Sequence, residues 1–253
     1  MKKATQGSTL IKTLLAMTLT ISALPMSSQD NSDFGLWTEI GAEKKLNQRW
    51  NAGLEAELRT SNKASQTSRW AAGLYGQYRI ATWLKARAGY QFLYDRREYE
   101  NTCEDGSSSP NISFWLPRHR IHFDLTGQYT TKNWTFSLRE RWQYTYQPEK
   151  TITTNCENAA DDIVGSVTYN GKGKNVLRSR IEIDYAFSTV PLTPYISVEL
   201  YNNWNIEKTR YTAGLEWNTT SHHSLGVFYR FEDMSDNDEN DMHIVCASYK
   251  YNF

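Results

Sequence analysis

The chain has 253 residues, a formal net charge of zero, 9 Trp, 16 Tyr and a mean hydropathy of −0.67. This hydropathy excludes a helical membrane protein, but it is compatible with a membrane β-barrel, in which lipid-facing residues alternate with polar ones. The zero net charge gives no electrostatic reason to expect nucleic acid as a partner. The many Trp and Tyr rings favour a protein at membrane interfaces, where one end of the ring is dry and the other wet.

The first 28 residues have the pattern of an export signal. Lys2, Lys3 and Lys12 supply positive charge, the apolar run from Leu14 to Leu24 follows, and small residues stand at 27 and 28. The run is too short to cross a bilayer as a helix, and no cysteine stands at the expected cleavage point, which argues against a lipoprotein. We therefore predict a signal peptide over 1–28 and one barrel domain over 29–253.

Alternation of apolar and polar residues with period two recurs along nearly the whole mature chain, in segments of about ten to thirteen residues. A transmembrane strand needs about 9 to 11 residues, so these lengths favour a barrel over an ordinary soluble sheet. In the segment 84–95, for example, Leu84, Ala86, Ala88, Tyr90 and Phe92 share one face. We predict an all-β fold, a transmembrane antiparallel β-barrel of 10 to 12 strands.

The opposite parity predicts a lumen wall rich in charges of both signs. Its members are Glu55, Glu57, Arg59, Arg87, Arg118, Arg120, Asp124, Arg139, Arg141, Arg178, Arg180, Glu182, Asp184, Glu199, Arg210, Glu216 and Arg230. In a narrow barrel, long Arg side chains are expected to meet carboxylates across the interior. Three functions then stay open: a plug closed by salt bridges, a narrow pore that filters small charged solutes, and a site for a specific ligand.

One segment departs from the alternation. Between Trp134 and Tyr146 the outward set includes Glu140, which is costly against lipid. A β-bulge near 139–141 would turn this residue inward. The alternative is a functional carboxylate that faces lipid.

Connections alternate between short and long, as expected when one rim faces the periplasm and the other the outside. The longer ones, expected as external loops, lie near 60–67, 97–116, 147–175, 202–207 and 233–241. Eleven strand segments can be counted, whereas single-chain bacterial barrels normally have an even number. Ten or twelve strands are therefore expected, with twelve favoured, if the first segment is split or a long loop hides a strand.

The chain ends as outer-membrane barrels end, with an aromatic face on its last strand. Tyr249, Tyr251 and Phe253 share one face, and the chain stops on the last of them. A soluble edge strand can also end on an aromatic residue. We take the three residues as a C-terminal barrel signal, which predicts the outer membrane of a bacterial cell.

Other residues that carry chemistry give weaker signals. Cys103 and Cys156 lie in the two longest predicted loops and are candidates for a disulfide in an exported protein. The acidic segment 233–241 lacks the glycine and terminal glutamate of a calcium loop, so a solvated loop is favoured over a metal site. His119 faces outward, but no serine stands at a matching height. We predict no metal, no cofactor and no catalytic residue.

Several longer segments resemble a known group. They are PRHRIHFDL (117–125), SLRERWQYTY (137–146), VLRSRIEIDY (176–185), PYISVELYNN (194–203) and RYTAGLEW (210–217), together with DFGLWTEIGAEKKLNQRWNAGLEAELR near the start. In this order the segments resemble an uncharacterised family of exported Gram-negative outer-membrane barrels, of the domain-of-unknown-function type. The resemblance covers nearly all of the mature chain. It implies a location and a fold but supplies no active-site residues.

We therefore expect a structural or small-solute channel barrel with a charged lumen, whose loops could also bind an external partner. The alternative is an enzyme that modifies lipids of the outer leaflet. Membrane lipids and the machinery that inserts outer-membrane barrels are the expected partners, and no nucleic acid is expected. The identity of the solute, the external partner and the oligomeric state do not follow from the sequence.

Overall fold

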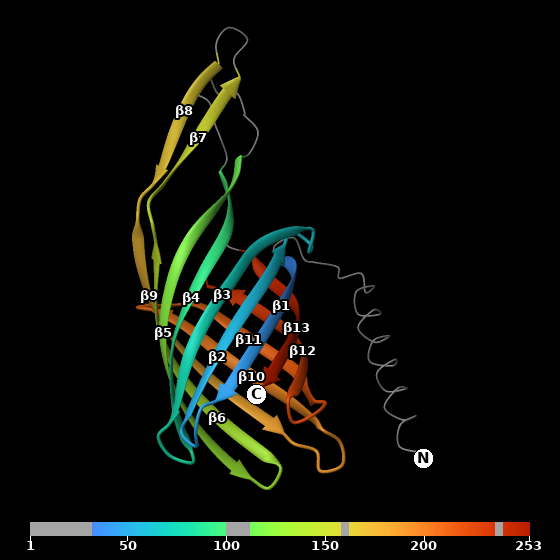
Figure 1. Ribbon diagram of the computed structural model, residues 1–253. Coiled ribbons are helices and arrows are strands. Elements are labelled where there is room, and N and C mark those ends of the chain that lie inside the picture. Colours follow the sequence, from blue (N-terminus) through green and yellow to red (C-terminus); the bar gives the residue numbers. More distant parts are fainter. Residues whose placement is uncertain (1–31, 100–111, 158–161, 236–239) are drawn as a thin grey trace. The chain divides into compact units, whose positions relative to one another are not determined.

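The computed structural model describes residues 32–99, 112–157, 162–235 and 240–253. The predicted signal peptide over 1–28 and Cys103 lie outside these ranges. Within them, all the regular structure is β-strand, and the strands form a closed barrel with a separate two-stranded sheet (Figure 1). The all-β barrel fold predicted from the alternation is confirmed.

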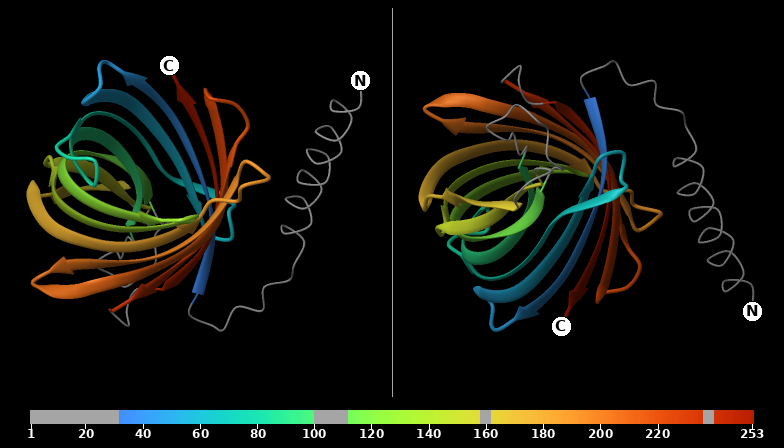
Figure 2. Two further views of the ribbon diagram at one scale, coloured as in Figure 1. Left: turned by 90° about the horizontal axis from the view of Figure 1, so that it is seen from below. Right: turned by 90° about the horizontal axis from the view of Figure 1, so that it is seen from above.

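Eleven strands form the barrel, and each extends over 12 to 20 residues. They are β1 (Ser32–Lys45), β2 (Trp50–Ser61), β3 (Gln66–Arg79), β4 (Leu84–Tyr99), β5 (Ile112–Thr131), β6 (Trp134–Gln147), β9 (Lys172–Tyr185), β10 (Leu192–Asn203), β11 (Asn205–Asn218), β12 (His223–Met234) and β13 (Asp241–Asn252). Strands that follow one another in this order pair antiparallel, and β1 lies next to β13 to close the ring (Figure 2).

Because the number of strands is odd, β1 and β13 run parallel where they meet. Gly35 lies beside Met242 and Glu43 beside Lys250, so residue numbers rise in the same direction on both strands. The backbone N–H of Phe253 donates to the carbonyl of Glu43 at 2.9 Å. Figure 1 shows both strands pointing the same way. We call this junction the seam.

The expectation of twelve strands is wrong. The first segment is one unbroken strand, β1, and the residues of the long loop that might have supplied another barrel strand pair with each other instead. They form β7 (Lys150–Glu157) and β8 (Asp162–Tyr169), which continue the β6–β9 hairpin beyond the barrel. The predicted loop 147–175 is therefore largely a hairpin.

A small apolar cluster joins the β7–β8 hairpin to β4 and β5. Phe114, Leu116 and Ile152 are buried together, with Tyr99 and Tyr169 packed against them. Lys150 also donates from Nζ to the carbonyl of Trp115 at 2.6 Å. The hairpin thus packs against the extended ends of β4 and β5, and these strands reach well into the region predicted as the loop 97–116.

The barrel has two rims. We call one of them the long-loop rim; it is formed by the connections β2–β3, β4–β5, β6–β9, β10–β11 and β12–β13. The opposite rim is called the short-turn rim. One connection on the long-loop rim is much tighter than predicted. Only Trp204 separates β10 from β11, and Asn203 pairs with Asn205 across it. Trp204 adopts a φ of 67° and is 96 % exposed. The predicted loop 202–207 is therefore a one-residue turn.

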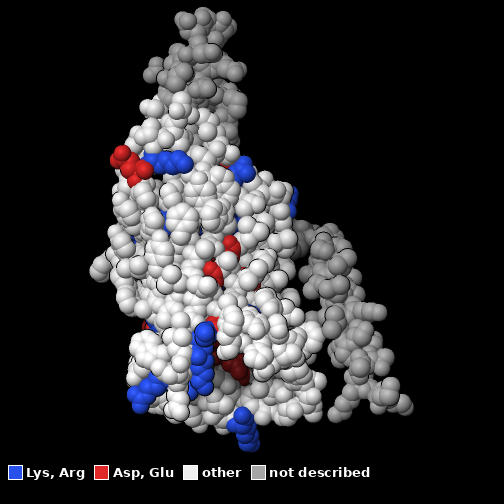
Figure 3. All heavy atoms as spheres, in the orientation of Figure 1, with Lys and Arg blue, Asp and Glu red and all other residues white. Residues whose placement is uncertain are grey.

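The outer wall is apolar, as the alternation predicts for a barrel in lipid. Leu54, Leu74, Ile181 and Ile196 each expose more than half of their surface. On the face drawn in Figure 3, the band between the two ends is mostly uncharged. Within the described residues, no helix is long and apolar enough to cross a membrane.

Aromatic pairs lie on the outer wall towards both rims. Towards the short-turn rim are Trp50–Tyr78, Trp134–Tyr185 and Tyr251–Phe253. Towards the long-loop rim are Trp70–Tyr94, Phe123–Trp142 and Phe231–His243. Two aromatic belts that flank an aliphatic band are typical of a membrane barrel. Tyr249, Tyr251 and Phe253, the predicted C-terminal signal, lie at the short-turn rim.

The β-bulge predicted near Glu140 is absent from the described pairing of β6. The register passes without a shift from Thr126–Arg139 through Leu125–Glu140 to Asp124–Arg141, and Glu140 also pairs with Ser179 on β9. Glu140 therefore keeps its outward parity. The hydroxyl of Ser179 donates to its carboxylate at 2.6 Å, so the polar group has a local partner that the sequence pattern did not reveal.

Inside the barrel, an apolar cluster covers the seam. Trp37 of β1, Phe228 of β12, and Ile244 and Cys246 of β13 are buried together. Ile244 and Cys246 have no exposed surface. These side chains bridge β1 to the strands next to it from within, at the one junction where the ladder is parallel.

Candidate functional site: the charged lumen

The lumen contains a cavity of about 1790 Å³. Its wall includes Lys172 and Asn205, the first residues of β9 and β11 at the long-loop rim. It also includes Ser224 and Lys250, which lie next to the short-turn rim. One continuous cavity therefore touches residues close to both ends of the barrel.

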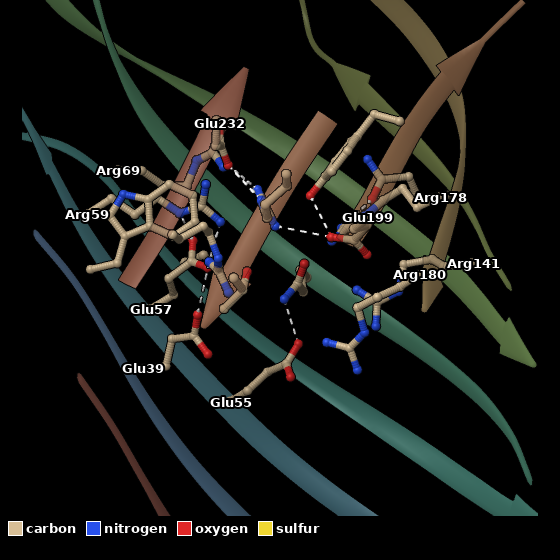
Figure 4. A pocket seen from close by; sticks show the side chains of 18 of the residues that line it. Glu39, Glu55, Glu57, Arg59, Arg69, Arg141, Arg178, Arg180, Glu199 and Glu232 are labelled. Carbon is tan, nitrogen blue, oxygen red and sulfur yellow. Dashed lines mark hydrogen bonds and ion pairs between the residues drawn. The ribbon is translucent and has the colours of Figure 1, made fainter. Parts of the chain in front are cut away.

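The structure places all seventeen charged residues predicted for the lumen on the wall of a cavity. Sixteen line the large cavity, and Asp124 lines a smaller one of about 150 Å³. Arg87, Arg139, Arg180 and Glu182 line both. Figure 4 shows labelled side chains from β1, β2, β3, β6, β9, β10 and β12 directed towards the large cavity.

Glu199 of β10 is the centre of one ion-pair network. Its carboxylate is 3 % exposed and accepts from Arg139, from Arg178 at 2.8 Å and from Arg210 at 3.3 Å. Arg210 continues to Glu232 of β12, which also pairs with Lys208 at 2.7 Å. Strands β6, β9, β10, β11 and β12 are thus linked by one set of charges.

Smaller networks occupy the wall formed by β2 to β6. Asp95 of β4 accepts from Arg69 of β3 and Arg118 of β5, the strands on either side. Asp124 receives two parallel hydrogen bonds from Arg141, at 2.7 and 2.6 Å. Such bidentate pairs fix geometry as well as contributing energy.

Several members of these networks were missing from the predicted set. Asp95 and Glu232 have the inward parity. Parity alone does not show that each of them binds several cations, because the cations within reach depend on the register with neighbouring strands. Arg69 lies in a segment with weak alternation, since β3 carries Ala and Gly on its inward face. The register of the barrel was needed to find them.

The predicted meeting of charges across the lumen is wrong. Every ion pair among the described residues joins positions on the same strand, on adjacent strands, or on strands separated by a single strand. The widest are Arg139–Glu199, Lys174–Glu207 and Arg230–Glu39. In this eleven-stranded barrel the paired carboxylates find their cations beside them on the wall, so the pairs leave the cavity open rather than filling it.

The wall of the large cavity is net positive although the chain is neutral overall. Seventeen Lys and Arg residues line it against ten Asp and Glu residues. The excess is seven positive charges in a confined space with low-dielectric walls, where a field of one sign is focused.

Aromatic rings contribute to the same wall. The Trp37 ring has the guanidinium carbons of Arg59, Arg230 and Arg210 at 3.5, 4.9 and 5.4 Å from its centre. The Tyr201 ring is approached by Arg178, Lys208 and Arg210, at 4.5 to 4.9 Å. Cation–π contacts of this kind hold long cationic side chains against the wall.

The other candidate sites gain no support. Cys103 and the side chain of Cys156 lie outside the described residues, as do Asp236, Asp238 and Glu239 of the acidic segment 233–241. Nδ1 of His119 bonds to the hydroxyl of Tyr90 at 2.7 Å, and its cross-strand neighbours are Phe92 and Tyr146, so the structure places no serine beside it. In the described parts of the chain, no group of three or more His, Cys, Asp or Glu residues is arranged to hold a metal ion.

Solved structures with a similar fold are outer-membrane barrels. The beta domain of the Bordetella autotransporter BrkA matches with a TM-score of 0.56 and 12% identity, over 81% of this chain and 83% of that one. The NanC porin matches with a TM-score of 0.45 and 14% identity, over 86% and 94%. The CymD monoaromatic hydrocarbon channel matches with a TM-score of 0.41 and 6% identity, over 76% and 66%.

The similarity to the BrkA beta domain shows the fold of this chain and gives no information about a solute. No curated protein matches the chain at a significant level. A family model does, over residues 34–243, which include all or most of every barrel strand from β1 to β12 and the first residues of β13. The chain belongs to the family described as Protein of unknown function (DUF2490), and it has the fold of an outer-membrane β-barrel.

Proposed function

We propose that this protein is a channel of the bacterial outer membrane that conducts small anionic solutes through its lumen. The observation that carries the proposal is the cavity that reaches both rims and has seventeen cationic residues on its wall against ten acidic ones. A narrow water-filled passage with this imbalance raises the local concentration of anions and lowers that of cations. The apolar outer wall with its two aromatic belts supports the membrane location.

The course of the ion pairs supports conduction over a closed plug. A plug made of salt bridges requires carboxylates and guanidinium groups that meet across the interior. In the described lumen they meet along the wall, through networks centred on Glu199 and Asp95. We assign these networks the role of holding long cationic side chains against the wall.

Measurements of single-channel current in planar bilayers test the proposal. In a KCl gradient, the reversal potential of the wild-type protein should have the sign of a channel that prefers chloride to potassium. Absence of current, or a preference for potassium, would contradict the proposal and favour a closed barrel or another function.

A pair of charge variants shows whether the lumen charges cause the preference. Arg97 lies on the cavity wall near the long-loop rim and is exposed, whereas Lys63 lies outside the cavity in the β2–β3 turn. Arg97→Glu should reduce the preference for chloride, because it changes the wall by two charges. Lys63→Glu makes the same change of charge outside the lumen and should leave the reversal potential within error of wild type.

A further inference from the structure

Arg120 is a lumen arginine without a carboxylate partner among the described residues, whereas Arg118, Arg139, Arg141, Arg178 and Arg210 each have one. Arg120, near the middle of β5, lines the large cavity and is half-buried. Its Nε donates to the hydroxyl of Thr145 at 3.1 Å, and its Nη1 lies 3.5 Å from the side-chain oxygen of Gln91. Both acceptors are neutral. Among the described residues, no carboxylate lies within 4.0 Å of this guanidinium group.

Other arginines of the same wall, on both sides of Arg120 along the strands, have acidic partners. Towards the short-turn rim, Asp124 stands between Arg87 and Arg141 in the pairing of β4, β5 and β6, and it binds Arg141. Towards the long-loop rim, Arg118 binds Asp95. The direct cross-strand neighbours of Arg120 are the neutral Gln91 and Thr145, so neither adjacent strand supplies an acid beside it.

The nearest acidic side chain of the same row is already occupied. Glu55 accepts a hydrogen bond from the amide nitrogen of Gln91 at 2.5 Å, and the oxygen of the same amide faces Arg120. Gln91 therefore separates Glu55 from Arg120. The arrangement keeps the carboxylate out of direct contact with the guanidinium group.

Further positive charges surround Arg120. The charges of Arg69, Arg178, Arg59 and Arg118 all act on it. A half-buried cation among like charges is unfavourable unless an anion neutralises it. The charge of Glu57 also acts on Arg120, but the Glu57 carboxylate is paired with Arg59 at 2.5 Å, so an anion in contact with Arg120 would come from the solution in the cavity.

We infer that Arg120 is the docking point for the acidic group of a small organic anion that passes through the lumen. The planar guanidinium group suits the two oxygens of a carboxylate or of a phosphate, to which it can donate in parallel. Thr145 and Gln91 hold the side chain in place while the anion is absent. The inference rests on the proposed function, because the anion is taken to be a transported solute.

The test compares block of the chloride current by added succinate and by inorganic phosphate. In wild type, at least one of the two anions should reduce the current with a saturable dependence on concentration. Arg120→Gln should raise the half-blocking concentration about tenfold or more, since a hydrogen-bonded charge pair is lost. Whichever anion shows the larger ratio identifies the preferred oxyanion.

Arg180→Gln is the matched control. It removes the same charge from the same cavity, but Arg180 already has Glu182 at 3.4 Å. Its half-blocking concentration should stay within about twofold of wild type. Equal effects of the two substitutions would show only a general loss of positive charge and would overturn the specific site. Circular dichroism of both variants should show an unchanged barrel.

A binding measurement separates failure of the site from failure of the channel. Isothermal titration of succinate and phosphate into the solubilised protein should give a binding signal that Arg120→Gln abolishes and Arg180→Gln retains. A wild-type protein that binds in this way but carries no current would contradict the proposed function and leave the site standing. A channel that prefers chloride but shows neither saturable block nor binding would contradict the site alone.

Discussion

Single carboxylates decide how the lumen charges are arranged. Glu199 faces three guanidinium groups, those of Arg139, Arg178 and Arg210, and is almost completely buried between them. Removing one partner from a buried charge network leaves the others uncompensated, which costs far more than the net contribution of an ordinary hydrogen bond. Residues of this type therefore matter for stability even where they take no part in transport.

We predict that Glu199→Gln lowers the free energy of unfolding by about 3 kcal/mol. The reason is that three cations, each largely buried, lose their shared negative charge. Urea titration of the protein in lipid vesicles, followed by tryptophan fluorescence, measures the effect. Glu216→Gln serves as the control, because Glu216 lines the same cavity and has no ion pair among the described residues; it should change stability by less than about 0.5 kcal/mol.

Glu140 is an acidic residue on the outer wall between the aromatic belts, and Ser179 is its hydrogen-bond partner. We predict that Glu140→Leu does not destabilise the barrel and raises its free energy of unfolding in vesicles, because a carboxylate against hydrocarbon is unfavourable. Leu138→Glu, two residues away on the same face, should have the opposite effect. A large loss of stability in Glu140→Leu would show that the carboxylate serves a purpose on this wall.

Among the elements, the seam between β1 and β13 differs from the other junctions of the barrel. Its strands run parallel, and parallel ladders are slightly less stable per residue than antiparallel ones. The buried cluster of Trp37, Phe228, Ile244 and Cys246 lies on the inner face of this junction. We interpret the cluster as the packing that keeps the barrel closed there.

We predict that Trp37→Ala lowers the free energy of unfolding by about 3 to 5 kcal/mol, the range for removing a large buried aromatic side chain. Trp37 is 3 % exposed, and loss of its ring also removes the surface against which Arg59 and Arg230 lie. The matched control is Trp50→Ala in the aromatic belt of the outer wall, where the ring is 48 % exposed. Equal effects in the two variants would contradict a special role of the cluster at the seam.

At the scale of the whole molecule, the net charge of the chain is zero, whereas the wall of its lumen has an excess of positive charge. Charges on the outside of the barrel compensate those of the wall in the total, but solutes inside meet the wall charges first. Mobile ions in the lumen screen the electric field of the wall charges, so the strength of this field depends on the ionic strength.

We predict that the preference for chloride weakens as salt rises. The screening length is about 10 Å at 0.1 M and about 3 Å at 1 M. Only the second value is short compared with the width of a barrel lumen. Reversal potentials measured with the same concentration ratio, centred first near 0.1 M and then near 1 M KCl, should therefore move towards zero. A preference that is independent of salt would indicate selection by contact at one site rather than by the wall as a whole.

Alternation along the chain was sufficient to predict the barrel, the direction of most side chains and the charged residues of its wall. This is possible because the side-chain period of a strand is two and the two faces of a membrane barrel meet opposite environments. This local rule is enough to assign every charged residue predicted for the lumen to the inner face of its strand, from Glu55 in β2 to Arg230 in β12.

Pairing between strands decided the rest. The odd count, the parallel seam and the β7–β8 hairpin depend on which segments find each other, and Glu140 stays on the outside because its register with Leu125 and Ser179 is unbroken. Which cation meets which carboxylate is also a matter of register, and alternation within one strand carries no information about it. For that reason the sequence does not show that Arg120 has the neutral Gln91 and Thr145 beside it, which the neighbouring strands place there.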